Sequence, residues 1–392
     1  MMGPALAQRP PLPIFQYLIL PDIALCCLIL IYPSKLWRFS AVAVFAYFNV
    51  KALSYTTGDG LQDYAFGCAV VAQLFTAIHL LCLTNPLRDF RHKHDVIPPS
   101  QQTLLKRLWW SFGVNHGPRG IGWNYQAPNL QPAPTEERWQ FVRSSLWRAL
   151  RFFILVDLAQ SYIHLNPLFS TFGSSALSIT AQGYVLRCLN IAAYSCTPYG
   201  MLNMQYSLLS AVAVSLDIVK PEFWIRPYGY WTDAYTIRRF WGRTWHQMMR
   251  RFLSSHGKFI ARTLGFRPGS QASSSTQLFA AFTLSGIIHS AGGDAMVGMK
   301  YLGASFPFFF AQAVGITIED IVIAVSRKMN VQSSQRARLV GYLWVFWWFS
   351  VTTPWYIDWS VEAGISRSEL FPVSPIRFIL NYLHVDVGQF FP

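Results

Sequence analysis

The chain has 392 residues, of which 52% are hydrophobic, 16% are aromatic and only 13% are charged, and its net charge is +14. Soluble domains carry about 25% charged residues, and a bilayer interior penalises charge, so this composition excludes an ordinary soluble protein. The apolar content also argues against nucleic acid as a partner. The positive charge is then explained by basic loops at a lipid bilayer and by a phosphate-rich ligand.

Apolar stretches recur along the whole chain, and a transmembrane helix needs about 20 mostly apolar residues. The sequence predicts an all-α, polytopic integral membrane protein with about eight transmembrane helices (roughly seven to nine), in a single domain over residues 1–392. A last apolar segment, 376–385, is too short to span and is predicted to lie at the membrane interface. The predicted spans are residues 14–32, 40–54, 64–83, 147–168, 183–216, 278–296, 304–325 and 340–357.

Two long polar loops, 85–144 and 220–276, are rich in Lys and Arg. The positive-inside rule places the large basic loops in the cytosol and both termini in the lumen. The expected location of this multi-pass protein is the membrane of the endoplasmic reticulum. Span 183–216 must then cross an odd number of times, which predicts one crossing plus a bent or re-entrant piece, broken at residues 198–200. Residues 127–134 are Pro-rich and predicted to be irregular, and residues 271–276 are predicted to form a flexible linker.

The six cysteines lie in apolar stretches without a CxxC pair or a zinc-ligand spacing. Buried free thiols are the simplest interpretation, and the sequence predicts no metal site.

His289 is the histidine with the most suggestive surroundings. It lies near the middle of the predicted span 278–296, among small residues, in the run Ser-Gly-Ile-Ile-His-Ser-Ala-Gly-Gly. An ionisable group at that depth indicates function, small residues allow close approach of a helix or a substrate, and desolvation favours the neutral imidazole that accepts a proton. A histidine that merely hydrogen-bonds a neighbouring helix explains the context equally well.

A second feature is the polar, aromatic and basic stretch 240–251, together with Arg238 and Arg239 just before it. Its arginines suit the phosphates of a nucleotide-like ligand, and its tryptophans suit a membrane interface. An interfacial helix with an aromatic-basic belt fits the same composition. The candidate ligand-binding residues here are Arg238, Arg239, Arg243, Trp245, Arg250 and Arg251.

Two weaker patterns involve short motifs. Gly120 and Gly122, in the run Arg119-Gly-Ile-Gly-Trp-Asn, suggest a tight backbone beside a ligand, although an ordinary turn is the better explanation of this motif by itself. His289 and Asp294 form an H-x4-D spacing that some glycerophosphate acyltransferases use, a two-residue pattern that often arises by chance.

Taken together, these segments resemble the wax-synthase-like branch of the membrane-bound O-acyltransferase superfamily. The resemblance covers roughly residues 110–360 and includes the order and separation of a polar motif and a downstream intramembrane histidine. The residues that carry it are Arg119-Gly120-Ile121-Gly122-Trp123-Asn124, Phe240-Trp241-Gly242-Arg243-Thr244-Trp245-His246 and Ser285-Gly286-Ile287-Ile288-His289.

The resemblance implies acyl transfer from acyl-CoA to an alcohol, with His289 and His246 as catalytic residues and no cofactor besides the acyl-CoA co-substrate. Compact chains of this type are similar to fungal O-acetyltransferases that modify hydrophobic terpenoid and meroterpenoid alcohols in secondary metabolism. Acetyl-CoA is therefore the expected donor, and a long-chain wax ester synthase is the alternative. The resemblance also assigns Arg119, Trp123 and Asn124 to acyl-CoA binding together with the arginines of 238–251.

Two other classes of protein compete with an enzyme. A membrane transporter would carry paired charges within broken helices, and a non-catalytic scaffold would leave His289 without a role. The candidate transport residues are Asp157, Arg187, Glu319 and Asp320.

Overall fold

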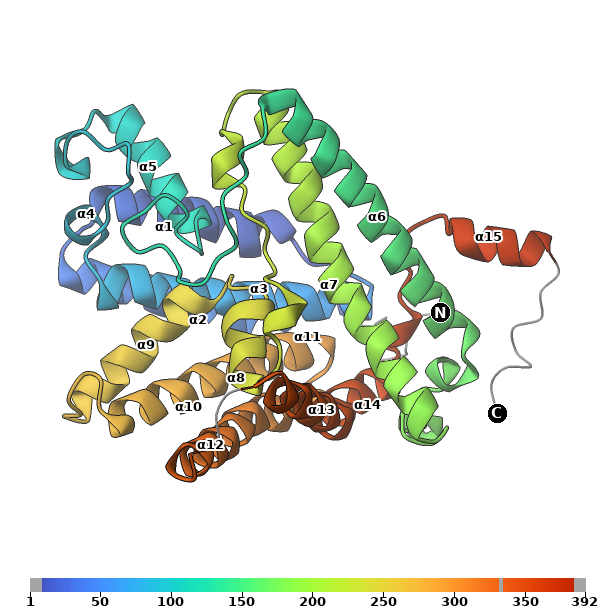
Figure 1. Cartoon of the computed structure of the whole chain (residues 1–392). Coiled ribbons are helices and arrows are strands. Elements are labelled where there is room, and N and C mark those ends of the chain that lie inside the picture. Colours follow the sequence, from blue (N-terminus) through green and yellow to red (C-terminus); the bar gives the residue numbers. More distant parts are fainter. Residues whose placement is uncertain (1–8, 331–333, 384–392) are drawn as a thin grey trace. The chain divides into compact units, whose positions relative to one another are not determined.

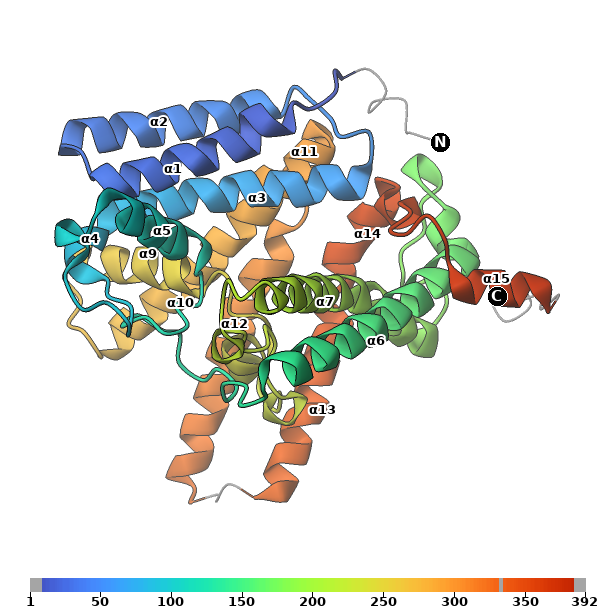
Figure 2. The same ribbon diagram turned by 90° about the horizontal axis from the view of Figure 1, so that it is seen from above.

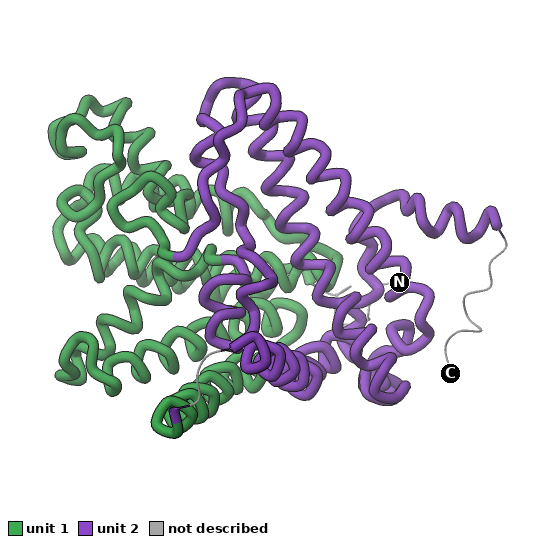
Figure 3. The backbone as a smooth tube through the Cα atoms, in the orientation of Figure 1, with its two compact units in different colours: residues 1–128, 247–329 green, residues 129–246, 330–392 purple. Residues whose placement is uncertain are grey.

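The structure is a computed structural model that describes residues 9–330 and 334–383, and this part of the chain is helical and contains no β-strand. An all-α fold is therefore confirmed. The chain divides into two compact units, one made of residues 1–128 and 247–329 and the other of residues 129–246 and 330–392 (Figure 3). The first boundary falls in the Pro-rich stretch 127–134, which is irregular as predicted. The single acyltransferase domain over residues 1–392 stays a prediction.

The first unit holds the N-terminal helices and the helix that leads to His289. Its helices are α1 (Leu20–Ile31), α2 (Lys35–Ala52), α3 (Gly60–Ile78), α4 (Pro86–Asp89), α5 (Leu104–His116), α9 (Arg250–Thr263), α10 (Gln271–Ile287), α11 (Ala295–Val297) and α12 (Phe306–Lys328). Shorter turns extend them at Phe15–Ile19 (η1), His79–Leu83 (η2), Pro99–Gln101 (η3), Ile288–Asp294 (η9) and Met299–Tyr301 (η10).

The second unit is built around two long helices. Its helices are α6 (Arg138–Leu165), α7 (Tyr184–Ser215), α8 (Ile237–Arg239), α13 (Gln335–Thr352), α14 (Pro354–Glu362) and α15 (Pro375–Tyr382). Its shorter turns are Pro167–Ser170 (η4), Gly173–Ser175 (η5), Pro221–Phe223 (η6), Trp231–Asp233 (η7), Phe240–Thr244 (η8) and Ile365–Arg367 (η11).

Helices α1, α2 and α3 run side by side in the first unit (Figures 1 and 2). A core of large apolar side chains joins them to α5 and to the turn η2. Burial of such side chains away from water stabilises the layer. The members of this core are Leu25, Ile29, Phe45, Ala77, Leu80, Leu81, Phe90, Trp110 and Val114.

Helices α6 and α7 form a long pair in the second unit (Figure 1). The predicted break at residues 198–200 is wrong, because α7 is one continuous helix of 32 residues with Pro198 inside it. Close packing explains the continuity: a Cβ added at Gly200 would lie 2.4 Å from a methyl group of Val156. The small side chains Ser145 and Ser210 also meet across the pair, with their hydroxyls 3.4 Å apart. Tertiary packing thus outweighs the backbone hydrogen bond that proline removes.

The predicted count of about eight transmembrane helices is also wrong. Among the described residues, only the helices Gly60–Leu83 and Met299–Lys328 are long and apolar enough to cross a membrane. They coincide with the predicted spans 64–83 and 304–325.

The other six predicted spans fall short for specific reasons. Charges and buried polar side chains interrupt 147–168 and 183–216, among them Asp157 and Asn190. The helix of span 340–357 ends before Pro354, and that of 278–296 changes into a π-helical turn rich in small and polar residues. The apolar part of 14–32 is the 17-residue segment Phe15–Ile31. Residues 40–52 of span 40–54 belong to α2, which also carries the charged side chains Lys35, Arg38 and Lys51. Apolar composition alone does not distinguish such packed helices from spanning ones.

The predicted flexible linker 271–276 is wrong, because these residues are the first turns of α10. The Ser270 hydroxyl caps that helix by accepting a hydrogen bond from the Ser273 backbone N–H at 3.2 Å, and Ser273 is buried. Serines that look like linker residues are also good N-cap residues. Residues 376–382 of the predicted interfacial segment 376–385 are helical and belong to α15, and residues 384–385 lie outside the described residues. The interfacial location stays a prediction.

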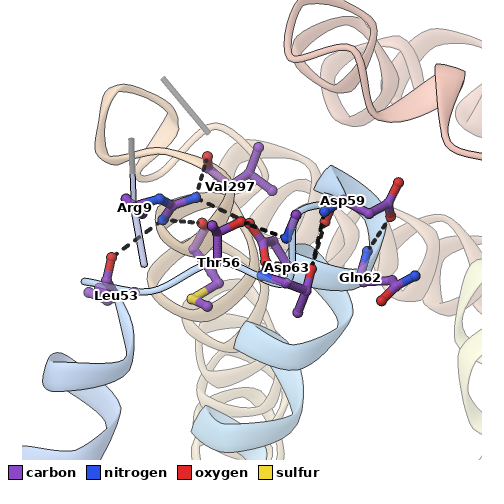
Figure 4. A network of polar contacts seen from close by, with 10 residues as sticks. Arg9, Leu53, Thr56, Asp59, Gln62, Asp63 and Val297 are labelled. Carbon is purple, nitrogen blue, oxygen red and sulfur yellow. Dashed lines mark hydrogen bonds and ion pairs between the residues drawn. The ribbon is translucent and has the colours of Figure 1, made fainter. Parts of the chain in front are cut away.

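A buried polar network joins the start of α3 to the segment that follows His289 (Figure 4). The Arg9 guanidinium pairs with the Asp63 carboxylate at 3.1 Å and donates to the Met296 carbonyl oxygen at 2.8 Å. Asp63 also accepts hydrogen bonds from the Thr56 hydroxyl at 2.6 Å and from the Thr57 backbone N–H at 2.6 Å. Every Asp63 oxygen therefore has partners, as a fully buried carboxylate requires.

Candidate active site

His289 lies on the π-helical turn Ile288–Asp294 that extends α10. This turn packs against α3 with very little space between the backbones: a Cβ added at Gly67 would lie 2.2 Å from the Gly292 carbonyl oxygen, and one at Gly293 would lie 2.4 Å from the Tyr64 ring. Glycine is required at such contacts because any side chain would separate the helices. Single π-helical turns within α-helices frequently occur at functional sites.

Three side chains from two other helices surround the His289 imidazole. Its Nδ1 lies 2.8 Å from the Tyr64 hydroxyl oxygen and 3.5 Å from the Cys68 Sγ, both on α3. Its ring stacks on Phe309 of α12, with centroids 4.1 Å apart and planes only 6° from parallel. The Tyr64 contact from α3 thus fixes the direction of Nδ1, and the stacking on α12 fixes the plane of the half-buried ring.

The Tyr64 contact determines what each imidazole nitrogen can do. If Nδ1 carries the proton and donates to Tyr64, the Nε2 lone pair becomes the acceptor that a general base requires. If Tyr64 donates to Nδ1, Nε2 carries a hydrogen and acts as a donor instead. The same pair can therefore deprotonate an alcohol or stabilise an oxyanion, according to tautomer.

Replacing Tyr64 with phenylalanine is expected to lower kcat about tenfold, because a hydrogen bond that orients the imidazole is worth roughly 1.4 kcal/mol. The KM for acyl-CoA should stay the same. The measurement is steady-state turnover per monodisperse protein in detergent. Tyr47→Phe is the matched control, because Tyr47 is exposed on α2 and should tolerate the change. A kcat of Tyr64→Phe within twofold of the parent would show that Tyr64 does not orient His289.

Asp294 has a structural role that the H-x4-D pattern does not reveal. Its carboxylate is fully buried and accepts hydrogen bonds from the Ser305 backbone N–H at 2.7 Å and from the Ser305 hydroxyl at 2.6 Å. It thereby joins the end of η9 to the residue that precedes α12. These contacts favour the structural interpretation of Asp294.

The segment 238–246 belongs to the second unit and has a closely packed backbone. A Cβ added at Gly229 would lie 2.0 Å from the Arg243 carbonyl oxygen, and the Gly229 N–H donates to the Thr244 carbonyl oxygen at 2.9 Å. The Arg239 guanidinium forms an ion pair with Asp233 and lies 4.3 Å from the Tyr235 ring centroid. The Arg239 guanidinium therefore has an ion-pair partner and an aromatic partner within the second unit.

Arg243 lies at a small polar cavity in the same unit. A guanidinium nitrogen is 4.0 Å from the Asp233 carboxylate, and the side chain is 39% exposed, so it retains access to a ligand. The cavity has a volume of about 170 Å³ and is lined by Asn129, Leu130, Gln131, Gly229, Tyr230, Asp233 and Arg243. Such a volume accommodates a phosphate-sized group. Arg238 lies on the one-turn helix α8 beside Arg239.

His246 follows this turn within an aromatic cluster. The Trp245 ring stacks with Phe240 at 5.6 Å, and the Tyr228 ring stands edge-on to both Trp245 and His246 at 5.2 and 5.8 Å. Burial raises the pKa of the Tyr228 hydroxyl, which stays a neutral hydrogen-bonding group at neutral pH. The sequence motif therefore forms a rigid aromatic site, and a catalytic role of His246 stays a prediction.

Arg250 and Arg251 belong to the first unit, at the start of α9. Arg251 donates to the Val114 carbonyl oxygen at 3.0 Å and lies 4.8 Å from the Tyr125 ring centroid. Burial lowers the pKa of its guanidinium, and these partners show that it ties α9 to the end of α5. Arg250 donates to the Gln247 side chain at 2.7 Å. Acyl-CoA contacts by either residue remain predictions.

The loop 119–124 also has a structural role within the first unit. Gly120 and Gly122 have φ angles of +60° and +80°, so the predicted tight backbone is present. Asn124 exchanges hydrogen bonds with the main chain of Asp89 and Arg91, and Trp123 packs edge-on to Trp110 at 5.8 Å. Arg119 is buried at 4% exposure. Their binding of acyl-CoA stays untested.

Two of the charged residues that are candidates for transport, Asp157 and Arg187, form hydrogen bonds with the main chain of neighbouring helices. Asp157 accepts a hydrogen bond from the Ile376 backbone N–H at 2.9 Å, next to the start of α15. Arg187 donates to the Ser350 carbonyl oxygen at 2.8 Å, which joins α7 to α13. Both contacts stabilise the second unit and explain why these charges are present.

Sequence reasoning missed the residues that hold the His289 ring, namely Tyr64, Cys68 and Phe309. Tyr64 is 225 positions from His289, so no local pattern connects them. One signal was available: α3 carries Gly67 and Cys68 within an apolar helix, a small-residue face that matches the glycines after His289. Pairing the two small-residue faces would have predicted this helix contact.

Comparison with known proteins supports an enzyme of a particular family. A family model described as membrane bound O-acyl transferase family matches residues 224–311, which include both His246 and His289. A second model, aspirochlorine biosynthesis protein F C-terminal domain, matches residues 137–215.

Three fungal relatives match most of the chain. Acetyltransferase eriL of Hericium erinaceus is 31% identical over 89% of this chain and 92% of its own length. Acetyltransferase ple2 of Rhodocybe pseudopiperita is 32% identical over 89% and 91%, and acetyltransferase pyr8 of Aspergillus fumigatus is 30% identical over 84% and 81%. The family implies membrane association, an acyl-CoA donor and a lipid or hydrophobic acceptor. This chain is therefore an acyltransferase and belongs to the membrane-bound O-acyltransferase family.

Proposed function

We propose that the protein is an O-acetyltransferase that moves the acetyl group of acetyl-CoA to a hydroxyl of a hydrophobic terpenoid or meroterpenoid in secondary metabolism. The names of the fungal relatives support acetyl as the transferred group. The observation that carries the mechanism is the contact of His289 with Tyr64 at 2.8 Å on a glycine-packed π-helical turn. We also propose that the two long apolar helices, Gly60–Leu83 and Met299–Lys328, cross the membrane of the endoplasmic reticulum.

His289 acts as the general base in this proposal. Its Nε2 takes the proton of the acceptor hydroxyl while the alcohol oxygen attacks the thioester carbonyl carbon. The tetrahedral intermediate then collapses, the C–S bond breaks, and coenzyme A leaves as a thiol after it receives the proton from His289. No proton or electron is left over, and the products are the acetate ester and free coenzyme A.

The negative charge that develops on the carbonyl oxygen requires hydrogen-bond donors. We assign this role to His246, supported by its place in the aromatic motif that precedes His289 in the chain.

The test of this function is product formation by the purified full-length protein in detergent. Labelled acetyl-CoA with a terpenoid alcohol should yield the labelled ester, while palmitoyl-CoA with a long-chain alcohol should yield much less. A reversed preference would identify a wax ester synthase instead. No ester from either pair would contradict the proposal.

Arg243 is expected to bind a phosphate of the donor. Arg243→Ala should raise the KM for acetyl-CoA about tenfold and leave the KM for the alcohol unchanged, because a partly exposed charge-assisted hydrogen bond contributes roughly 1.4 kcal/mol. Arg262→Ala, at an exposed position near the end of α9, is the matched control. If both variants share the parental KM for acetyl-CoA, the donor phosphates bind elsewhere.

A further inference from the structure

Three side chains of types that can ligate a metal, Asp22, Cys26 and His116, come together in the first unit. Asp22 and Cys26 are four residues apart on α1 and therefore share one face of that helix. His116 is the last residue of α5. One donor atom from each residue lies within 4.8 Å of the other two, and His116 Nε2 is 3.0 Å from the Asp22 carboxylate. We propose that these three residues bind a divalent transition metal ion, preferably Zn²⁺.

The helices that carry the three donors are held together by a core. Leu25 and Ile29 of α1 pack in the same apolar cluster as Trp110 and Val114 of α5. The donors therefore project from rigid, packed helices, which limits the movement that a metal must induce. Zinc bonds of about 2.0–2.3 Å place tetrahedral ligands roughly 3.5 Å apart, so small side-chain shifts close the present separation.

Hydrogen bonds to the donors are arranged as they are around known metal ligands. His116 Nδ1 lies 3.1 Å from the Phe112 carbonyl oxygen, which directs Nε2 toward the cluster. The second Asp22 oxygen accepts from the Asn115 amide at 2.8 Å and from the Gln73 amide at 3.5 Å, and the Asn115 amide is also 3.5 Å from Cys26 Sγ. Such partners fix the tautomer of a ligating histidine and the direction of a ligating carboxylate.

The donor set indicates which metal binds. One thiolate, one imidazole and one carboxylate suit Zn²⁺ and exclude Mg²⁺ and Ca²⁺, which prefer oxygen. Three protein ligands leave a fourth tetrahedral position. A cavity of about 510 Å³, lined by both Asp22 and Cys26 and otherwise mainly apolar, provides space for water or a small ligand there.

Metal binding must displace protons. Both ring nitrogens of His116 face oxygen acceptors: Nδ1 lies 3.1 Å from the Phe112 carbonyl oxygen and Nε2 lies 3.0 Å from the Asp22 carboxylate. A proton on each nitrogen satisfies both acceptors, and His116 then forms an ion pair with Asp22. Binding releases the imidazole and thiol protons, so the affinity should rise with pH. The bound ion would replace this ion pair and tie α1 to α5.

Cobalt titration of the purified, chelator-treated full-length protein tests the site, because Co²⁺ bound to a thiolate absorbs in the near-ultraviolet. The parent should develop this band with one equivalent of Co²⁺, and Zn²⁺ should abolish it. Cys26→Ser should remove the band, whereas Cys27→Ser, at the neighbouring exposed cysteine, should keep it. His116→Gln should weaken Co²⁺ binding by about 100-fold or more.

Thermal unfolding with and without Zn²⁺ is a second test, which separates loss of metal binding from poor folding of a variant. Zn²⁺ should raise the thermal unfolding temperature of the parent and of Cys27→Ser, but not that of His116→Gln, whose substitution lies at a partly exposed helix end. The proposal is overturned if the parent shows no thiolate band. A band that persists in Cys26→Ser, or an unchanged Co²⁺ affinity in His116→Gln, overturns it as well.

Discussion

Replacing His289 with alanine is expected to lower turnover per folded protein by about 10²–10⁴-fold, the usual contribution of a general base. The imidazole is held between Tyr64 and Phe309. An alanine side chain has no group that can accept the alcohol proton. The KM for acetyl-CoA should change little, because the donor phosphates are proposed to bind elsewhere. The measurement is single-turnover ester formation with protein that is monodisperse in detergent.

His256→Ala is the matched control for this experiment. His256 is also buried in the first unit, and its Nδ1 lies 2.8 Å from the Phe252 carbonyl oxygen, a purely structural contact. Its loss should lower stability and leave turnover per folded protein near the parental value. If His289→Ala behaves as His256→Ala does, His289 is structural and the proposed mechanism is wrong.

Replacing Asp63 with alanine is expected to lower the free energy of unfolding by about 3–5 kcal/mol, because it leaves the Arg9 guanidinium without its buried counter-ion. Asp63 is fully buried and precedes Tyr64 directly. Through Arg9 it also holds the Met296 carbonyl oxygen, seven residues after His289. The variant should therefore lose activity at temperatures where the parent is stable. Thermal unfolding in detergent, followed by activity after heating, measures both effects.

Asp59→Ala is the matched control at the same end of α3. Asp59 is an N-cap whose carboxylate accepts from the Gln62 backbone N–H at 2.9 Å, and loss of such a cap costs about 1 kcal/mol. A double replacement, Arg9→Met with Asp63→Leu, should recover part of the lost stability, since no buried charge is left unpaired. Equal losses for Asp59→Ala and Asp63→Ala would contradict the importance of the buried pair.

Much of the chemistry could be predicted from local sequence. His289 stands out because it is an ionisable residue within an apolar, glycine-rich run. Neighbouring residues in the sequence show this without any knowledge of the fold. The tight turns at Gly120 and Gly122 were likewise predictable, since both positions have positive φ and glycine adopts it without strain. The family resemblance, which the comparisons confirm, depended on the order of such local motifs.

The number of membrane-spanning helices could not be predicted in the same way. An apolar helix that packs against another helix and one that faces lipid have similar compositions. In α7, the buried Asn203 and Ser207 and the contact of Gly200 with Val156 show packing against protein, which hydropathy does not report. The same packing keeps α7 continuous at Pro198, where local propensity predicts a break.

By itself, the sequence determined that the chain is helical, apolar and basic, and that His289 and the segment 238–246 are its strongest candidates for chemistry, because composition and local motifs carry that information. Only the tertiary structure decided which side chains contact His289 and which arginines form hydrogen bonds that hold helices together. Tyr64 reaches His289 because glycines allow α3 and the π-helical turn to touch, and Arg251 is engaged because α5 ends beside it. Such contacts join residues more than a hundred positions apart, and distance in space is set by packing rather than by spacing along the chain.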